Sequence, residues 1–321
     1  MNNEFRFFAE GILRRSPTDL REKYLIIILG PTGIGKTGLS INIAKRLNTE
    51  IISCDSRQFF KELSIGTAVP SKEQLTLVKH HFIHNMSIHD YYNASKFESE
   101  VIDLLIKLFR KKDYVIMVGG SGMYIDAVCH GIDDLPEIDP ELRRSLHEKL
   151  EKEGLESLRF DLKKVDPDYY KTVDLKNSQR ILRALEVFNM TGKPYSSFRK
   201  KIKKKRDFSI FKVGLNMDRK KLYEKINKRV DNMIAEGLVE EARSVLKYRD
   251  LTPLKTVGYR ELFGYFDKKT TLEEATEKIK SNTRKYARRQ LTWFGRDKDI
   301  KWFNPDEKDK ILNYIKNHST I

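Results

Sequence analysis

The octapeptide Gly30-Pro-Thr-Gly-Ile-Gly-Lys-Thr37 carries the residue types that hold a phosphate chain. Apolar residues 24–29 before it predict a buried strand, and residues 37–46 after it predict a helix. A glycine-rich turn between them directs backbone N–H groups and the positive end of the helix dipole at an anion. The Lys36 ammonium suits the outer phosphates, and the Thr37 hydroxyl suits Mg²⁺. The predicted diphosphate-binding P-loop comprises Gly30, Pro31, Thr32, Gly33, Ile34, Gly35, Lys36 and Thr37.

One carboxylate belongs beside this loop. The strand predicted at residues 50–55 ends in Asp55, and strand ends line the ligand crevice of an open α/β sheet. P-loop hydrolases and kinases usually show a later strand that ends in a metal-holding Asp. Here the strand at 114–118 is followed by Gly119-Gly-Ser-Gly122 instead. We therefore expect a diphosphate ligand without complete ATP-hydrolysing chemistry, and Asp55 as a general base or as a ligand of Mg²⁺ through water.

The composition indicates a polyanionic partner. The 321 residues suit one large domain or two, with 39% hydrophobic residues, 34% charged residues and a net charge of +16. Basic runs at 199–206 and 284–289 favour nucleic acid over a proteome that is merely rich in lysine. Two cysteines exclude a disulfide framework and a four-thiolate zinc site. The sequence shows neither an 18-residue apolar run nor a signal-peptide core, so we expect a cytoplasmic protein.

The expected fold is α/β, with a P-loop NTPase-like parallel sheet flanked by helices and a small helical insertion domain. Strands and helices alternate over 24–130, and a strand at 208–215 returns to the sheet. Helical spacing predicts helices at 141–152, 155–163 and 177–190, then at 219–236, 238–248, 258–265 and 272–294. The expected parts are an N-terminal extension (1–23), a P-loop α/β core with C-terminal helices (24–130 and 207–321) and a helical insertion (131–206).

Four histidines near residue 85 raise the alternative of a metal site. His80, His81, His84 and His89 have no thiolate or acidic partner at zinc spacing, so a structural role is favoured. No sustained heptad repeat indicates an oligomer, and we expect a monomer.

Several further strings occur in one order along the chain. They are Asp55-Ser56, Ile65-Gly-Thr-Ala68, Gly119-Gly120, Gln179-Arg-Ile-Leu-Arg-Ala-Leu-Glu-Val187, Thr191-Gly-Lys-Pro194, Val257-Gly-Tyr-Arg260 and Arg289-Gln-Leu-Thr-Trp-Phe294. With the P-loop, they make the chain resemble the bacterial tRNA dimethylallyltransferases over about residues 25–303. The resemblance implies transfer of a dimethylallyl group to N6 of adenine 37 in tRNA. It also implies that the P-loop holds dimethylallyl diphosphate with Mg²⁺ rather than ATP.

The resemblance assigns roles to particular residues. Catalysis falls to Asp55 as the base and to Lys36, Thr37 and Arg229 at the diphosphate, with Thr37 also at the metal. The spacing of Arg284, Lys285, Arg288 and Arg289 predicts a shared helix face suited to phosphates. Contacts with tRNA are expected for these four residues and for Asp55, Ser56, Arg57, Gln58, Ser121, Arg143, Gln179, Arg180, Ile181, Leu182, Arg183, Lys255, Thr256, Val257, Gly258, Tyr259 and Arg260.

Two departures and several alternatives accompany this interpretation. Ser121 stands where the family usually has Thr, and Lys176-Asn-Ser178 stands where it often has Asn-Asp-x. No cysteine follows Cys129, so the C-terminal zinc finger of eukaryotic relatives is not expected. A P-loop kinase or phosphotransferase, a prenyltransferase acting on free AMP, and a non-catalytic RNA-binding protein are the alternatives.

Overall fold

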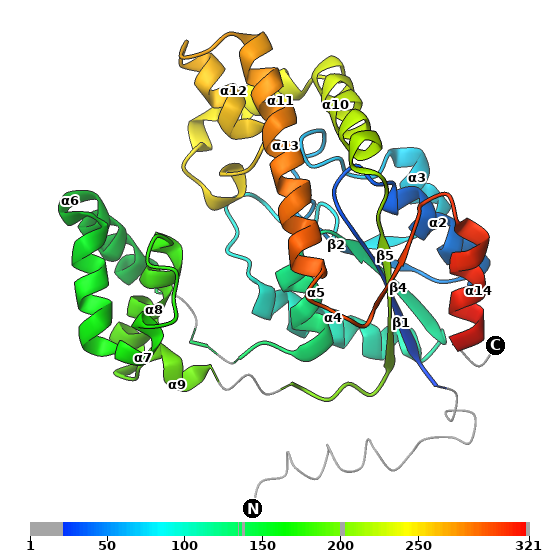
Figure 1. The fold of residues 1–321 in the computed structure, drawn as a ribbon, viewed down its shortest axis with the longest axis horizontal. Coiled ribbons are helices and arrows are strands. Elements are labelled where there is room, and N and C mark those ends of the chain that lie inside the picture. Colours follow the sequence, from blue (N-terminus) through cyan, green and yellow to red (C-terminus); the bar gives the residue numbers. More distant parts are fainter. Residues whose placement is uncertain (1–21, 134, 137–138, 200–202, 319–321) are drawn as a thin grey trace, which may run out of the picture. The chain divides into compact units, whose positions relative to one another are not determined.

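A sheet of six parallel strands lies within the part of the described chain outside residues 130–205 (Figure 1). The computed structural model describes residues 22–133, 135–136, 139–199 and 203–318, so nearly all of the predicted N-terminal extension lies outside it. The strand order is β3-β2-β4-β1-β5-β6. The strands are β1 (Tyr24–Leu29), β2 (Ile51–Cys54), β3 (His80–His81), β4 (Tyr114–Gly119), β5 (Ser209–Leu215) and β6 (Ile300–Phe303). The predicted parallel sheet is confirmed.

The register places the chemically interesting turns at one edge of the sheet. Leu29 at the end of β1 lies opposite Gly119 of β4, and Gly119 lies opposite Cys54 of β2. The P-loop, Asp55 and the glycine-rich turn follow these three residues directly. Strand β1 is buried along its whole length, as its apolar, β-branched sequence predicts. The central position of β1 therefore fixes where the P-loop emerges.

Helices cover the sheet and extend beyond its carboxyl edge. Helices α2, α10, α13 and α14 pack side chains against β1, β4 and β5, while α11 and α12 join α10 and α13 in a second apolar core. Sequence reasoning did not predict β3, β6, α3, α5 or α14. The helices of this part are α2 (Lys36–Arg46), α3 (Lys72–Leu77), α4 (Ala94–Phe109), α5 (Gly122–His130), α10 (Arg219–Ala235), α11 (Leu238–Ser244), α12 (Tyr259–Phe266), α13 (Leu272–Phe294) and α14 (Lys308–His318).

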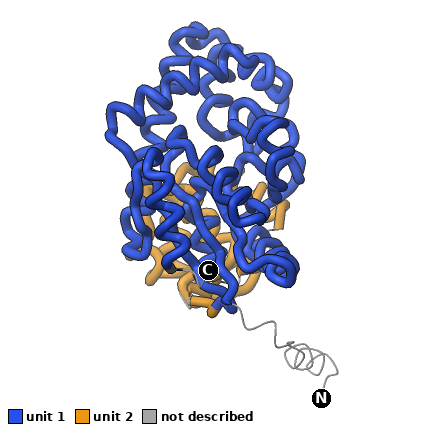
Figure 2. The backbone as a smooth tube through the Cα atoms, turned by 90° about the vertical axis from the view of Figure 1, so that its right-hand side faces the viewer, with its two compact units in different colours: residues 1–129, 206–321 blue, residues 130–205 orange. Residues whose placement is uncertain are grey.

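The structure divides into two compact units (Figure 2). One comprises the described residues up to Cys129 and from Arg206 onward, and the other runs from His130 to Lys205. The second unit contains α6 (Pro140–Val165), α7 (Pro167–Tyr170), α8 (Ser178–Thr191) and α9 (Tyr195–Phe198) around a core of leucine side chains. At Gly154 the backbone of α6 leaves the helical conformation, with φ 79° and ψ 178°. This break separates the two helices predicted there.

In the described residues, no helix has both the length and the apolar composition needed to cross a membrane.

Gly119 provides a test of how tightly the strand ends pack. A Cβ atom at Gly119 would lie 2.0 Å from the Cys54 carbonyl oxygen, so Gly119→Ala must push β2 and β4 apart. We expect this change to lower the free energy of unfolding by roughly 3 kcal/mol, as in overpacked cores. Urea denaturation would measure it. Gly264→Ala is the matched control, because its Cβ meets nothing closer than 3.9 Å inside α12. The control should gain about 0.5 kcal/mol from helix propensity, and equal stability of both variants would contradict the tight packing.

Candidate active site

The P-loop leads directly into the N-terminus of α2. Gly35 precedes the helix in a left-handed conformation, and no side chain caps the helix there. The first N–H groups of such a helix suit an anion. Thr32, Gly33, Gly35, Lys36 and Thr37 line a cavity of about 210 Å³ at this point. Five of the eight predicted P-loop residues thus surround one space, while Gly30 and Pro31 do not line it and the side chain of Ile34 is fully buried.

Lys36 lies against its own loop. Its Nζ donates hydrogen bonds to the carbonyl oxygens of Gly30 (3.0 Å) and Pro31 (2.9 Å). Burial, followed by the positive charge of Arg229, lowers the pKa of Lys36 to about 7, while the charge of Asp55 acts in the opposite direction. Burial also lowers the pKa of Arg229. The two cations and one acid thus influence each other across the cavity, and an anion between them would favour the charged form of Lys36.

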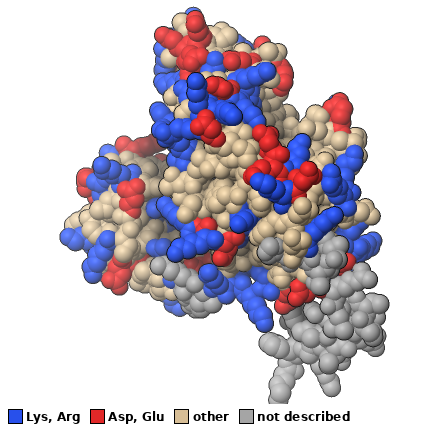
Figure 3. Space-filling model, turned by 45° about the vertical axis from the view of Figure 1, so that its right-hand side comes forward, with Lys and Arg blue, Asp and Glu red and all other residues tan. Residues whose placement is uncertain are grey.

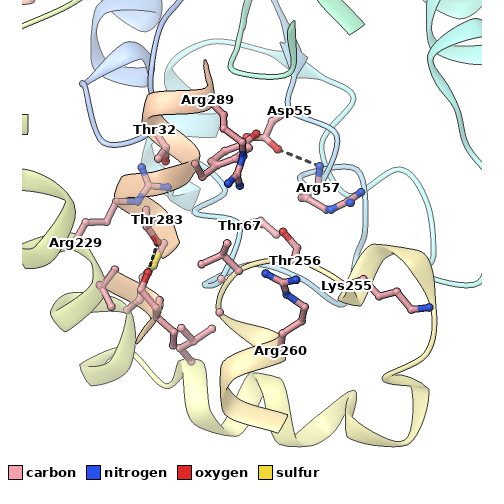
Figure 4. A pocket seen from close by; sticks show the side chains of 18 residues that line it. Thr32, Asp55, Arg57, Thr67, Arg229, Lys255, Thr256, Arg260, Thr283 and Arg289 are labelled. Atoms are coloured by element: carbon pink, nitrogen blue, oxygen red, sulfur yellow. Dashed lines mark hydrogen bonds between the residues drawn. The ribbon is translucent and has the colours of Figure 1, made fainter. Parts of the chain in front are cut away.

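Asp55 follows the end of β2 and lines both this cavity and a larger one beside it. The backbone N–H of Arg57 donates to its Oδ1 at 3.0 Å, which fixes the orientation of the carboxylate (Figure 4). A carboxylate held by a backbone donor at the junction of two cavities can accept a proton from a group in one of them while an anion occupies the other.

The larger cavity has a volume of about 350 Å³ and is strongly cationic. Five cationic side chains and one carboxylate are among the described residues that line it. The cations come from four different segments (Figure 4), and Lys255 extends away from the others. They are Arg57, Arg229, Lys255, Arg260 and Arg289. The remaining lining residues are Thr32, Gly66, Thr67, Val230, Met233, Leu238, Thr256, Val257, Gly258, Ile279, Thr283 and Tyr286.

A buried glutamine connects two of the turns at the strand ends. The side-chain oxygen of Gln290 in α13 accepts a hydrogen bond from the backbone N–H of Thr32 at 2.8 Å. Its Nε2 donates to the carbonyl oxygen of Gly120 at 2.9 Å. One side chain therefore holds the P-loop, the glycine-rich turn after β4 and α13 together.

Several predicted tRNA contacts instead make hydrogen bonds inside the protein. Ser121 accepts from the backbone N–H of Ser56 at 3.0 Å. The Nε2 of Gln58 donates to the carbonyl oxygens of Thr67 and Ala68. Both side chains lie at the site and shape it, as Gln58 also lines the smaller cavity.

Three residues expected at the RNA are buried in the protein. Tyr259 and Ile181 are 0% exposed and Leu182 is 1% exposed, so these predicted contacts are wrong. Tyr259, the first residue of α12, belongs to the second apolar core, and the other two belong to the core of the helical unit. Their neighbours Gln179 and Arg180 are exposed on α8. The predicted RNA-binding motif that begins at Gln179 thus includes residues from both the exposed and the buried face of α8.

A buried carboxylate engages two further predicted tRNA-binding residues. Within the helical unit, Glu186 accepts from Arg143 Nε at 2.7 Å and from Arg183 Nη1 at 3.3 Å. Arg183 also donates to the carbonyl oxygen of Pro136. Because Glu186 is only 1% exposed, removal of either guanidinium group would leave its buried charge incompletely compensated, which is destabilising.

The four cationic side chains of the basic run in α13 have different surroundings. Arg284 donates to Asn227, and Arg288 lines a separate groove of about 330 Å³ with Tyr223 and Leu222. Arg289 alone of the four lines the large cavity, and Lys285 is exposed. Over the face shown in Figure 3, Lys and Arg side chains are mixed with Asp and Glu. The four cations thus have different surroundings, and the phosphate-binding face predicted for this helix stays a prediction.

The four histidines make separate contacts. His80 lies against the Val78 carbonyl, His81 against Glu50, His84 against Ser64 and His89 against the ring of Tyr248. Within the described ranges, no three His, Cys, Asp or Glu side chains are placed to hold a metal ion.

Sequence reasoning missed several residues of this site. Gln290, Glu241, Tyr286 and Met233 were not identified, although Gln290 lies inside a quoted motif. One signal could have found it: with Ile279, Ala287 and Phe294 it follows the buried register of α13, where it is a polar side chain among apolar ones. Tyr286 lies on the same helix but is not a polar residue of its buried register, and Glu241 stands beside a second glutamate in α11, so neither gives such a contrast.

Together these features define an α/β protein of the P-loop class, with a phosphate-binding turn that opens into a cationic cavity. The sequence model of the IPP transferase family matches residues 58–297. A tRNA dimethylallyltransferase of Bacteroides fragilis is 52% identical over 91% of this chain and 97% of its own length. The chain belongs to the IPP transferase family.

Solved structures agree with this assignment. A tRNA isopentenylpyrophosphate transferase of Bacillus halodurans is similar, with a TM-score of 0.67, 34% identity and coverage of 92% of this chain and 96% of that one. A eukaryotic dimethylallyltransferase acting on tRNA has a TM-score of 0.75 at 24% identity, over 92% of this chain and 80% of that one. The second likeness supports the fold alone.

The lowered pKa of Lys36 predicts proton uptake on anion binding. With a pKa of about 7, much of Lys36 is neutral at pH 8, and a bound diphosphate raises that pKa. Binding of inorganic diphosphate should therefore cause the protein to take up on the order of half a proton or more at pH 8. Uptake should be smaller at pH 6, where Lys36 is already charged. Calorimetry in buffers of different ionisation enthalpy measures this. Lys36→Met is the control, and equal uptake in this variant would contradict the prediction.

Proposed function

We propose that this enzyme transfers a dimethylallyl group from dimethylallyl diphosphate to N6 of adenine 37 in tRNA. The observation that carries the proposal is the junction of two cavities at Asp55, one beside the phosphate-binding P-loop and one lined by cationic side chains. A diphosphate donor and a polyanionic acceptor need two such spaces that meet at the reacting atoms. Membership of the IPP transferase family and the tRNA-modifying relatives support the same reaction.

On the donor side, the reaction breaks the bond between the allylic carbon and the bridging oxygen, and the electron pair stays on diphosphate. Negative charge therefore grows at that oxygen. The N-terminus of α2, Lys36 and Arg229 lie where they can stabilise it. We assign the donor's diphosphate to the smaller cavity and its prenyl end to the junction with the larger one.

On the acceptor side, N6 of adenine is a weak nucleophile because its lone pair is delocalised into the ring. As the N6–carbon bond forms, the nitrogen must lose one proton. Asp55 is the carboxylate at the junction, and its orientation is set by the Arg57 N–H. We assign this proton to Asp55, a role typically worth about 10²–10⁴-fold in rate.

Mg²⁺ fits the donor set at the P-loop. The Thr37 hydroxyl and the Asp55 carboxylate line the same cavity and are hard oxygen ligands, which Mg²⁺ prefers together with phosphate oxygens. When bound, the ion would supply positive charge to the leaving diphosphate. Under this proposal Asp55 accepts the N6 proton directly and contacts Mg²⁺ through a water molecule.

Recognition of tRNA is assigned to both units by charge and exposure. In the first unit, Arg57, Arg260 and Arg289 line the large cavity, where an extruded adenine and its flanking phosphates need cations. In the helical unit, Gln179 and Arg180 are exposed on α8 and are the proposed contacts. We further propose that the enzyme is a cytoplasmic monomer.

The alternatives explain fewer of these features. A kinase needs an acid after β4, where this chain has Gly119 and Gly120. An enzyme for free AMP has little use for a cavity with five cationic side chains. A transfer assay with tRNA, AMP and ATP as separate substrates tests all of them, because only the proposed reaction adds a dimethylallyl group to tRNA.

Asp55→Asn tests the base. We expect kcat to fall at least about 100-fold, because the amide cannot accept the N6 proton, while Kd for tRNA stays within about twofold. Single-turnover transfer and filter binding measure the two quantities. Asp103→Asn, on the exposed side of α4, is the matched control. Recovery of the rate by excess Mg²⁺ would show that Asp55 acts through the metal instead, and an unchanged rate would remove it from catalysis.

Arg289→Gln and Arg288→Gln test which side of α13 meets RNA. Of these two arginines, only Arg289 lines the large cavity. Its loss should therefore reduce the log–log salt slope of tRNA binding by about 0.7, as for one phosphate contact. Arg288→Gln should leave the slope unchanged. A reversed pattern would place the RNA on the groove of Arg288 and Tyr223.

A further inference from the structure

One carboxylate that lines neither cavity accepts hydrogen bonds from three consecutive backbone N–H groups of a loop. Glu241 in α11 accepts from the N–H groups of Ser64 and Ile65 at its Oε2 and from Gly66 at its Oε1, each at 2.8 Å. Its Oε1 also accepts from the hydroxyl of Tyr259 at 2.7 Å. A carboxylate has about four acceptor sites. All the hydrogen-bonding capacity of Glu241 is thus directed at one loop and one tyrosine.

Tyr259 contacts both Glu241 and the loop that Glu241 holds. It is 0% exposed, and burial together with the charge of Glu241 raises the pKa of its hydroxyl, so the group stays a neutral donor. A Cβ atom on Gly66 would lie 2.6 Å from this hydroxyl oxygen. Only glycine fits there without displacement, and the loop therefore rests directly on the tyrosine ring.

The loop held in this way forms part of the wall of the large cavity. Gly66 and Thr67 line that cavity beside Val257 and Gly258, which precede α12. The carbonyl oxygens of Thr67 and Ala68 accept from Gln58, whose backbone N–H donates to the carbonyl of Asp55 at 3.1 Å. The wall is tied to Glu241 at one end and to the turn that carries Asp55 at the other.

We propose that Glu241 and Tyr259 are positioning residues for the acceptor: they fix the Ser64–Thr67 wall against which the target adenine is placed beside Asp55. The proposal rests on the prenyl transfer proposed above. Among the described residues that line the two cavities, neither Glu241 nor Tyr259 occurs, so both act through the loop. Glu241 holds residues 64–66, and Gly66 and Thr67 line only the larger cavity, whereas Ala68, which Glu241 does not contact, lines the smaller one. Loss of the Glu241 contacts should therefore affect the RNA side more than the diphosphate side.

Glu241→Gln is the decisive variant, because its amide nitrogen must face backbone N–H groups that need an acceptor. We expect kcat/KM for an anticodon stem-loop RNA to fall at least about tenfold, the usual effect of losing a charge-assisted hydrogen bond, and Kd for dimethylallyl diphosphate to stay within about twofold. Glu240→Gln is the control, since it makes the same change at an exposed position of the same helix.

Tyr259→Phe keeps the ring under Gly66 and removes only the donor. It should lower kcat/KM for RNA by about threefold, and the double variant should be no worse than Glu241→Gln, because both changes break one shared bond. This variant also decides the matter if Glu241→Gln does not fold. Equal kcat/KM in the variants and wild type, or a parallel loss of donor affinity, would overturn the positioning role. Failure of the wild-type enzyme to modify tRNA would instead overturn the proposed function.

Discussion

The structure depends on the two hydrogen bonds of Gln290. Its amide accepts from Thr32 in the P-loop and donates to Gly120 after β4, so a C-terminal helix is joined to two turns of the sheet. Neither turn has a regular ladder to hold it, because both begin where strands end. A side chain with one acceptor and two donors suits this place, since a carboxylate could not satisfy the Gly120 carbonyl. The positions of the cavity residues on α13, Arg289 included, follow from this bond.

The charged side chains at the site determine which kind of ligand it attracts. Asp55 is the one carboxylate among the described residues that line the large cavity, and five cations line it as well, so the site attracts polyanions. Burial, and after it the positive charge of Arg229, lowers the pKa of Lys36. Under the proposed reaction, two anionic substrates can approach this pair of cavities without strong mutual repulsion, because the protein supplies compensating charge between them.

Local pattern predicted the sheet, the P-loop and the acid at the end of β2, because each depends on residues close together in the chain. The pattern also separated the helical insertion from the sheet. It failed where burial decides the role: Tyr259, Ile181 and Leu182 belong to motifs whose exposed members resemble binding residues, and only packing shows which way each one faces. The backbone partners of Gln290 and Glu241 lie more than 160 residues away, so local pattern did not reveal these contacts. Short strands such as β3 lack enough residues to show a period.

Gly154 has a consequence for how the chain reaches its final structure. The corner that it makes in α6 brings the two halves of the helix together over a single residue, and Lys149 bonds Asp161 across it. The contacts of the helical unit are consequently local, which favours rapid folding. Strand β1 must pair with both β4 and β5, yet this unit separates β4 from β5 in the chain. An insertion that folds early shortens the effective loop between these strands and reduces the entropy lost when the sheet closes.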